Sequence, residues 1–181
     1  MRIISGKYGR RRFATPGNLK LRPTTDLAKE ALFNTLAARY DFEGAHVLDL
    51  FAGTGSIGLE FLSRGAERVV SVEQNARHAA FIKQLVQSLG EQEVMRVVKG
   101  DALAFLAGGG GGGEVYDFIF ADPPYALPNL PSIPQAVQQS GLLRRGGLFI
   151  LEHPAEYDFA AQPGFLFHKS YSAVQFTFFE F

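Results

Sequence analysis

The sequence predicts a single α/β domain built on a mostly parallel sheet with a Rossmann-like turn. From Ala45 onward, short apolar runs alternate with helical patterns, which is typical of parallel strands joined by crossover helices. Some runs are apolar at successive positions, as at 118–121, and strands buried on both faces have this pattern. The 181 residues, 46% of them hydrophobic, are enough for one core and too few for two.

The expected elements follow one another in a regular order. Strands are predicted at 46–51, 68–72, 95–98, 115–121 and 148–152, and helices at 56–64, 76–89, 102–106 and 134–143. Two further strands, 165–169 and 173–181, lie too close together for a crossover helix, so an antiparallel hairpin is expected there. The glycine run 108–113 is expected to be a flexible loop tip.

An N-terminal extension precedes this core. Thr24, Thr25 and Asp26 offer helix-capping side chains after a proline, so a helix is predicted to run from there to about Arg39. Residues 1–22 contain three glycines and a proline, which suits a short hairpin or an extended arm. We expect residues 1–40 to be an extension of the domain that spans 41–181, and not a separate domain.

Composition excludes several classes of protein. The chain has no cysteine, so it has neither a disulfide framework nor a thiolate metal site. Its four histidines are scattered without metal-ligand spacing, and no metal is expected. No apolar run has the length needed to cross a bilayer, and the basic N-terminus has no apolar region behind it. The expected location is therefore the cytoplasm, with no membrane partner.

The net charge of zero conceals an uneven distribution. Residues 1–22 hold seven basic side chains and no acid, whereas the remainder holds 18 acids. A basic arm on an acidic body favours a polyanionic partner that meets one face of the protein. The cluster Arg10, Arg11 and Arg12 is its densest part, and a solvated turn explains that cluster equally well.

A glycine-rich turn follows the first core strand. Gly53, Gly55 and Gly58 match the G-x-G-x-x-G pattern, in which a ligand approaches the main chain closely. Glu73 falls at the end of the next strand, where a carboxylate can hold ribose hydroxyls. By itself this pattern is equally typical of a nicotinamide dinucleotide site.

Asp49 shifts the interpretation to S-adenosyl-L-methionine. It stands four residues before the first glycine, in a D-x-F-x-G-x-G context that includes Phe51. A carboxylate there repels a pyrophosphate but attracts a sulfonium and an α-ammonium. A purely structural Asp49 would cap local amides. Asp101 and Ala102 follow the third strand, where the aspartate can accept from an adenine amino group, cap a helix, or do both.

The tetrapeptide Asp122-Pro123-Pro124-Tyr125 directly follows the buried strand 115–121. Two prolines remove two backbone donors and make a rigid platform at the strand's carboxyl end, where open α/β sheets bind ligands. The Asp122 carboxylate and the Pro123 carbonyl can accept both N–H groups of an exocyclic amine, which aims its lone pair at a methyl sulfonium. Tyr125 can stack on an extruded base. We therefore predict an amino-methyltransferase acting on a nucleobase.

With these residues in place, the chain resembles the RsmD family of bacterial 16S rRNA guanine-N2 methyltransferases. The matching segments are 1–8, 21–26, 30–34, 49–58, 62–66, 72–73, 101–102 and 122–125, and R-P-T-T-D and E-A-L-F-N are the most particular of them. The resemblance implies a seven-stranded class I methyltransferase sheet with an antiparallel C-terminal strand. It also implies a guanine N2 target in small-subunit rRNA, within an assembled or assembling particle.

Some site residues are implied only by this resemblance. Arg22, Pro23 and Thr24 would line the site beside the cofactor and the target base, and the cluster Arg10–Arg12 would touch phosphates. The chain departs from the family pattern at Leu27, at Ser172 and in the glycine run 108–113. A monomer is expected.

Three other functions remain open at this point. D-P-P-Y also serves adenine-N6 methylation, although 181 residues leave no room for a separate DNA target-recognition domain. An RNA-binding assembly factor without turnover would leave the acids Asp49, Glu73 and Asp122 unexplained. A nicotinamide oxidoreductase is disfavoured by Asp49 and gives no role to 122–125.

Overall fold

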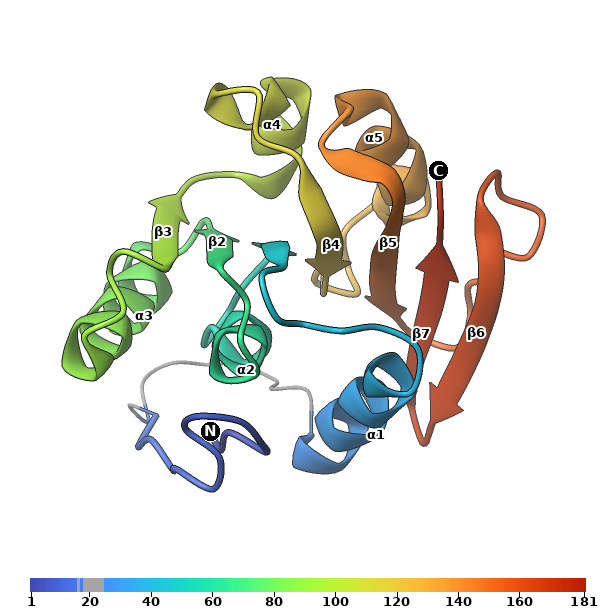
Figure 1. The fold of residues 1–181 in the computed structure, drawn as a ribbon. Helices are drawn as coiled ribbons and strands as arrows, with labels where there is room; N and C mark the ends of the chain where they lie inside the picture. Colours follow the sequence, from blue (N-terminus) through green and yellow to red (C-terminus); the bar gives the residue numbers. More distant parts are fainter. Residues whose placement is uncertain (16, 18–24) are drawn as a thin grey trace.

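The computed structural model describes residues 1–15, 17 and 25–181, and its centre is a seven-stranded sheet in the order β3-β2-β1-β4-β5-β7-β6 (Figure 1). The strands are β1 (His46–Leu50), β2 (Arg68–Glu73), β3 (Met95–Lys99), β4 (Tyr116–Ala121), β5 (Leu143–His153), β6 (Phe165–Tyr171) and β7 (Val174–Phe179). Strands β1 to β5 pair in parallel, and β7 pairs antiparallel with both β5 and β6. The predicted seven-stranded, mostly parallel sheet with an antiparallel C-terminal strand is confirmed.

The strand order reverses between β1 and β4. The chain first moves outward from β1 to β2 and β3, and then returns to place β4 on the other side of β1. Loops leaving the carboxyl ends of β1 and β4 therefore diverge and leave a crevice between them. Ligands of open α/β sheets bind at such a switch point.

Helices cover both faces of the sheet (Figure 1). The helices α1 (Asp26–Ala37), α2 (Ser56–Ser63) and α3 (Ala76–Leu89) lie on one face, and α4 (Ala102–Ala107) and α5 (Ile133–Ser140) on the other. Alternate residues of each strand feed the two cores: Val47 joins the α1–α3 side and Leu48 the α4–α5 side. Because both faces of these strands are covered, successive residues are apolar in the sequence.

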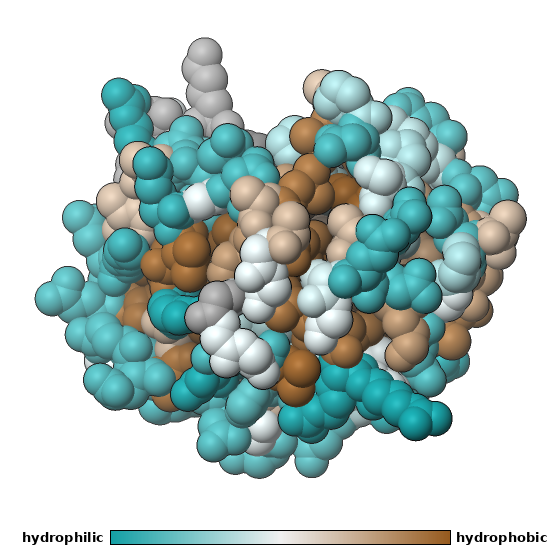
Figure 2. Space-filling model, turned by 90° about the horizontal axis from the view of Figure 1, so that it is seen from above, coloured by the Kyte–Doolittle hydropathy of each residue, from teal (hydrophilic) through white to brown (hydrophobic). Residues whose placement is uncertain are grey.

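The outer surface differs from these cores. Seen from the side on which α4 and α5 lie, the molecule shows hydrophilic side chains around its rim and apolar ones gathered nearer the middle (Figure 2). Among the described residues, no helix is long and apolar enough to span a membrane.

Helix ends explain most element boundaries. The side chain of Asn75 caps α3 by accepting from the Arg77 and His78 amides, and Gly90 ends the helix with φ of 73°. Gly141, at φ 66°, ends α5 at Ser140, earlier than the predicted 143. Strand β5 begins at Leu143 and not at 148, two residues after this glycine.

The C-terminal strands form the expected antiparallel hairpin. Ser172 and Ala173 make its tight turn, in which Ser172 takes a positive φ of 58°. Phe167 on β6 stacks on Phe178 on β7 with ring centroids 4.3 Å apart. Aromatic side chains of this segment therefore pack the edge strand β6 against β7.

The N-terminal arm packs against the domain in its first thirteen residues. The backbones of Arg2 and Arg12 form an isolated antiparallel β-bridge. The side chain of Ile3 is fully buried in the core shared by α1 and α2. Within the glycine run, Gly109–Gly111 forms a short 3-10 turn with Gly110 at φ 67°, and the expected flexibility of this loop tip stays a prediction. The division of the chain near residue 40 stays a prediction.

Candidate active site

A cavity of about 670 Å³ opens at the carboxyl ends of β1, β2, β4 and β5. Its floor comes from the loops that follow these strands, and its far wall from the β6–β7 turn, Tyr171 to Val174. Thr25, which caps α1, also lines it. The cavity therefore lies over the switch point of the sheet, and it brings together the glycine turn and the 122–125 tetrapeptide.

Asp49 lies at the bottom of the cavity on β1 and is 1% exposed. Its Oδ2 accepts from the Gly58 amide at 3.1 Å and from Ser71 Oγ at 3.3 Å. Burial raises the pKa of this carboxyl to about 7, although the two hydrogen bonds oppose the shift. The structural role that the sequence left open is therefore present, and the same side chain faces a ligand-sized space.

Gly58 is required by this arrangement. A Cβ on Gly58 would lie 2.7 Å from Ser71 Oγ and 3.0 Å from Asp49 Oδ2. Gly55, with φ of 75°, is not among the residues that line the cavity, and a Cβ there would meet the Ile82 side chain of α3. Two of the three motif glycines thus serve packing around the turn, and a contact between Gly55 and the cofactor stays a prediction.

The glycine turn holds Glu73 in place. Phe51 and Gly53 both take φ of 57°, and the Gly53 amide donates to Glu73 Oε2 at 2.7 Å. The Asn75 amide donates to the other oxygen of Glu73 at 2.7 Å. Two charge-assisted bonds fix the carboxylate, while its remaining lone pairs can accept from ligand hydroxyls. Phe51, Gly53 and Glu73 all line the cavity.

Asp101 has the helix-capping role that the sequence allowed. Its Oδ1 accepts from the Ala104 amide at 2.8 Å at the start of α4. Asp101 and Ala102 also line the cavity, on the side formed by β2 and β3. Capping and ligand contact are compatible in this position.

The tetrapeptide 122–125 forms the opposite part of the floor. The backbone amide of Asp122 points to the Leu50 carbonyl at 3.5 Å, which fastens the end of β4 to β1. Pro123 is buried, Pro124 is exposed and Tyr125 is half-buried, and all four residues line the cavity. The tetrapeptide thus shares one cavity with Asp49 and Glu73.

Sequence reasoning missed Glu152 and the β6–β7 turn. Glu152 lies near the carboxyl end of β5, lines the cavity and is 3% exposed. An acid at a strand's carboxyl end is the signal that singled out Glu73 and Asp122, and it applied to Glu152 too. The turn carried no such signal, because only the hairpin's place in the fold brings it over the cavity.

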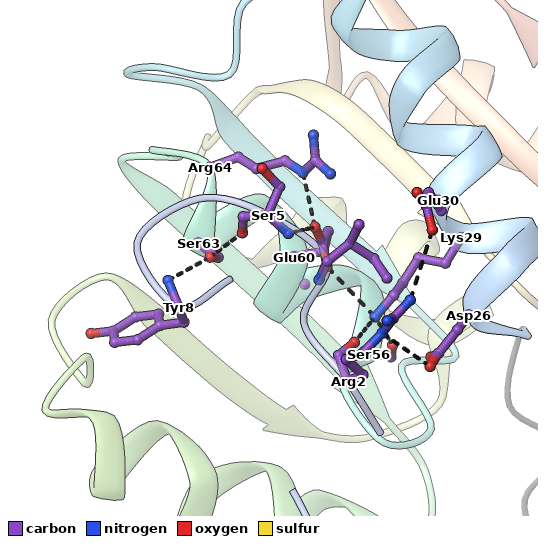
Figure 3. A network of polar contacts seen from close by, with 12 residues as sticks. Arg2, Ser5, Tyr8, Asp26, Lys29, Glu30, Ser56, Glu60, Ser63 and Arg64 are labelled. Atoms are coloured by element: carbon purple, nitrogen blue, oxygen red, sulfur yellow. Dashed lines mark hydrogen bonds and ion pairs between the residues drawn. The ribbon is translucent and has the colours of Figure 1, made fainter. Parts of the chain in front are cut away.

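A buried polar network joins the N-terminal arm, α1 and α2 (Figure 3). Lys29 of α1 and Glu60 of α2 are fully buried, with Nζ and Oε2 3.5 Å apart. Lys29 Nζ also donates to the Arg2 carbonyl and, at 2.9 Å, to Ser56 Oγ. Since Ser56 lines the cavity, the network joins the N-terminal arm and α1 to the site. Burial lowers the pKa of Lys29.

Glu60 accepts the remaining donors of this network. Its two oxygens accept from the backbone amides of Ile4 and Ser5 at 2.8 Å and 3.0 Å, and from Arg64 Nε at 2.9 Å. A single buried carboxylate therefore anchors the arm to α2. Neither Lys29 nor Glu60 was predicted from the sequence to belong to the site.

The basic cluster Arg10–Arg12 lies on an exposed turn of the arm. Arg10 takes a positive φ of 70°, and the Arg11 guanidinium lies 5.0 Å from the centroid of the Tyr8 ring. None of the three lines the cavity. Their role would therefore be away from the reacting atoms. Arg22, Pro23 and Thr24 lie outside the described residues.

Known proteins are similar to this chain over most of its length. The model of the family described as conserved hypothetical protein 95 matches residues 1–180. Over 158 residues the chain is 35% identical to ribosomal RNA small subunit methyltransferase D of Escherichia coli K12, covering 86% of this chain and 76% of that protein.

Solved structures match over the full length. A hypothetical protein of Thermus thermophilus is 30% identical, with a TM-score of 0.86 and coverage of 100% of this chain and 99% of that one. The Escherichia coli protein yhhF is 31% identical, with a TM-score of 0.84 and coverage of 99% and 97%.

Proposed function

The chain belongs to the family described as conserved hypothetical protein 95, the RsmD family, and from this premise we propose that it methylates the exocyclic N2 amine of a guanine in 16S rRNA. The methyl donor is S-adenosyl-L-methionine. One observation carries the proposal: a single cavity is lined by both the glycine turn with its acids and by residues 122–125. Donor and acceptor sites in one cavity are what direct group transfer requires.

The acids around the glycine turn fit this donor. Asp49 and Glu73 present carboxylates, and the turn presents close backbone, to a molecule with two cationic groups and a ribose. A pyrophosphate would meet Asp49 unfavourably. S-adenosyl-L-methionine supplies an electrophilic methyl group on its sulfonium, so the protein's task is to orient it and to exclude water.

The acceptor amine is oriented by the tetrapeptide. The Asp122 carboxylate and the Pro123 carbonyl accept the two N–H groups and turn the nitrogen lone pair toward the methyl group. Pro123 and Pro124 make the loop rigid, and Tyr125 stacks on the flipped base. A base held in this way reacts without a metal.

The remaining contacts involve the rRNA outside the cavity. The exposed cluster Arg10–Arg12 binds phosphates. The substrate is the assembled or assembling small subunit, and the protein acts as a monomer. The printed name of the Escherichia coli relative, a small subunit rRNA methyltransferase, supports this choice of partner.

Nucleoside mass spectrometry tests the proposal. The protein is incubated with S-adenosyl-L-methionine and unmodified small ribosomal subunits, with naked 16S rRNA and DNA in parallel. We expect new N2-methylguanosine from the subunits. N6-methyladenine would keep the chemistry and overturn the base assignment. Cofactor binding without any methylated product would favour a non-catalytic RNA-binding factor.

A further inference from the structure

Glu152 is a buried acid on the floor of the cavity, and the proposed function gives it no task. It lies near the carboxyl end of β5, and β5 neighbours β4, the strand that Asp122 directly follows (Figure 1). We propose that Glu152 selects guanine by accepting a hydrogen bond from the N1–H of the target base. This inference rests on the proposed function, and it addresses a question that the tetrapeptide leaves open, because D-P-P-Y serves both guanine and adenine.

The register of the sheet brings the two carboxylates level with each other. Phe120 pairs with Ile150 and Ala121 with Leu151, so the next residues along the two strands are Asp122 and Glu152. Neighbouring strands are about 4.8 Å apart. The two acids therefore occupy adjacent positions on the same edge of the sheet.

Side-chain alternation puts Glu152 on the face that carries the cavity. Ile150 belongs to the core beneath α1–α3 and Leu151 to the opposite core, so Glu152 returns to the side of Ile150. Asp49 lies on this same face, two residues after Val47 of that core. Along the sheet the acids follow the strand order β2, β1, β4 and β5.

This strand order divides the cavity into a side for the methyl donor and a side for the base that accepts the methyl group. Glu73 and Asp49, on β2 and β1, lie on the cofactor side of Asp122, and Glu152 lies on the opposite side. A base whose amine is held at Asp122 must extend away from the cofactor. Its neighbouring ring atoms then lie over β5 and under the β6–β7 turn, within reach of Glu152.

Guanine and adenine differ in the atoms beside the amine. In guanine the N2 amine is adjacent to N1–H, which is a donor, whereas the N6 amine of adenine is flanked by N1 and N7, which are acceptors. A carboxylate next to the amine accepts from guanine N1–H but faces a lone pair of adenine. An ionised carboxylate has about four acceptor sites, so it can hold a protein donor and the base together.

Burial of Glu152 strengthens its discrimination between guanine and adenine. The Glu152 side chain is 3% exposed. In the antiparallel pairing of β5 with β7, Glu152 lies opposite Phe176. A buried acceptor that faces the wrong base is not compensated by water, which is why such sites reject analogues strongly. The fixed position of β5 between β4 and β7 keeps the carboxylate in register with Asp122.

The test uses 2-aminopurine, which keeps the 2-amino group of guanine but has an acceptor at N1. Small subunits are reconstituted with 16S rRNA that carries guanine or 2-aminopurine at the nucleotide that the wild type methylates. For the wild type we expect kcat/KM to be at least about tenfold higher with guanine. Glu152→Gln should lose at least about tenfold with guanine, and little or nothing with 2-aminopurine, because its amide can donate to N1.

Two controls separate the possible causes of lost activity. S-adenosyl-L-methionine binding by Glu152→Gln should stay unchanged, and the exposed Glu156→Gln, which makes the same change outside the cavity, should retain wild-type activity on both bases. Equal losses on both bases in Glu152→Gln would overturn the inference. So would a wild type that does not discriminate between the two bases, and this readout needs no variant to fold. A wild type that never methylates guanine would overturn the proposed function itself.

Discussion

Burial and the positive charge of a ligand shift the pKa of the Asp49 carboxyl in opposite directions. The carboxyl is 1% exposed, and burial raises its pKa to about 7 from an ordinary value of 3.8. A cation in the cavity favours the ionised form and lowers the pKa again. Binding of S-adenosyl-L-methionine should therefore release a proton from this residue at pH values below 7.

The first prediction is a pH-dependent affinity. The dissociation constant for S-adenosyl-L-methionine should fall by up to about tenfold per pH unit between pH 5.5 and 7, and level off above that. Isothermal titration calorimetry in buffers of different ionisation enthalpy measures both the affinity and the released proton. Asp49→Asn should bind weakly with no such slope, and should match the wild type at the acid end. A steep slope that persists in the variant would assign the titration to another group.

The second prediction concerns the amine. Asp122→Ala removes an acceptor that acts on the reacting nitrogen, so kcat should fall by about a hundredfold or more. Affinity for S-adenosyl-L-methionine should change little, because the cofactor side of the cavity is untouched. Single-turnover methylation and calorimetry measure the two effects. Near-normal turnover would remove Asp122 from the mechanism.

The acids that sequence reasoning found lie in or just after predicted strands. Glu73, Asp101 and Asp122 follow such strands, Asp49 lies within the first one, four residues before the glycine turn, and all four line the cavity. Parallel topology gathers the carboxyl ends of strands at one edge, so the sequence pattern alone was sufficient to bring these acids together. Gly55 comes from the glycine motif, and a Cβ there would meet Ile82, so the motif alone does not distinguish ligand contact from packing around the turn.

At the level of elements, prediction depended on local signals. The boundaries of α3, predicted at 76–89, match the structure, in which a capping asparagine and a terminal glycine mark them. The early start of β5 at Leu143 was missed, since residues 143–147 include two arginines and two glycines and join β4 through an irregular register. Such pairing depends on the neighbouring strand and leaves no periodic pattern of its own.

The buried pair Lys29–Glu60 was missed for a related reason. A lysine and a glutamate on amphipathic helices are ordinarily solvated, and only the packing of α1, α2 and the arm encloses them here. Glu60 holds Lys29 and two backbone amides of the arm. The three elements are therefore joined through one carboxylate.

The third prediction concerns this carboxylate. Glu60→Ala leaves the Lys29 ammonium buried without its partner, so the free energy of unfolding should fall by about 3–5 kcal/mol. Urea denaturation measures it, with the exposed Glu93→Ala as control. A double variant, Lys29→Met with Glu60→Leu, should recover part of the loss. A single variant as stable as the control would mean that the arm, α1 and α2 are held by apolar packing alone.

At the scale of the whole molecule, the basic cluster of the arm is separate from the cavity that holds the proposed reaction. The cavity is lined by acids that suit a cationic donor, whereas the acid-free arm exposes Arg10, Arg11 and Arg12 away from it. A polyanionic substrate is repelled by the first region and attracted by the second. The arm would therefore supply much of the affinity for rRNA, while the cavity selects the base that is methylated.

The fourth prediction follows from this separation. Replacing Arg10, Arg11 and Arg12 with serine should weaken binding to small subunits and reduce the slope of log affinity against log salt by about 2, since each phosphate contact contributes about 0.7–0.9. Turnover at saturating subunit concentration should persist, because the arginines do not line the cavity. The matched control removes three exposed charges elsewhere, Lys83, Arg145 and Lys169, and should leave the slope nearly unchanged. Equal effects of the two triple variants would show that net charge, and not the arm, attracts the RNA.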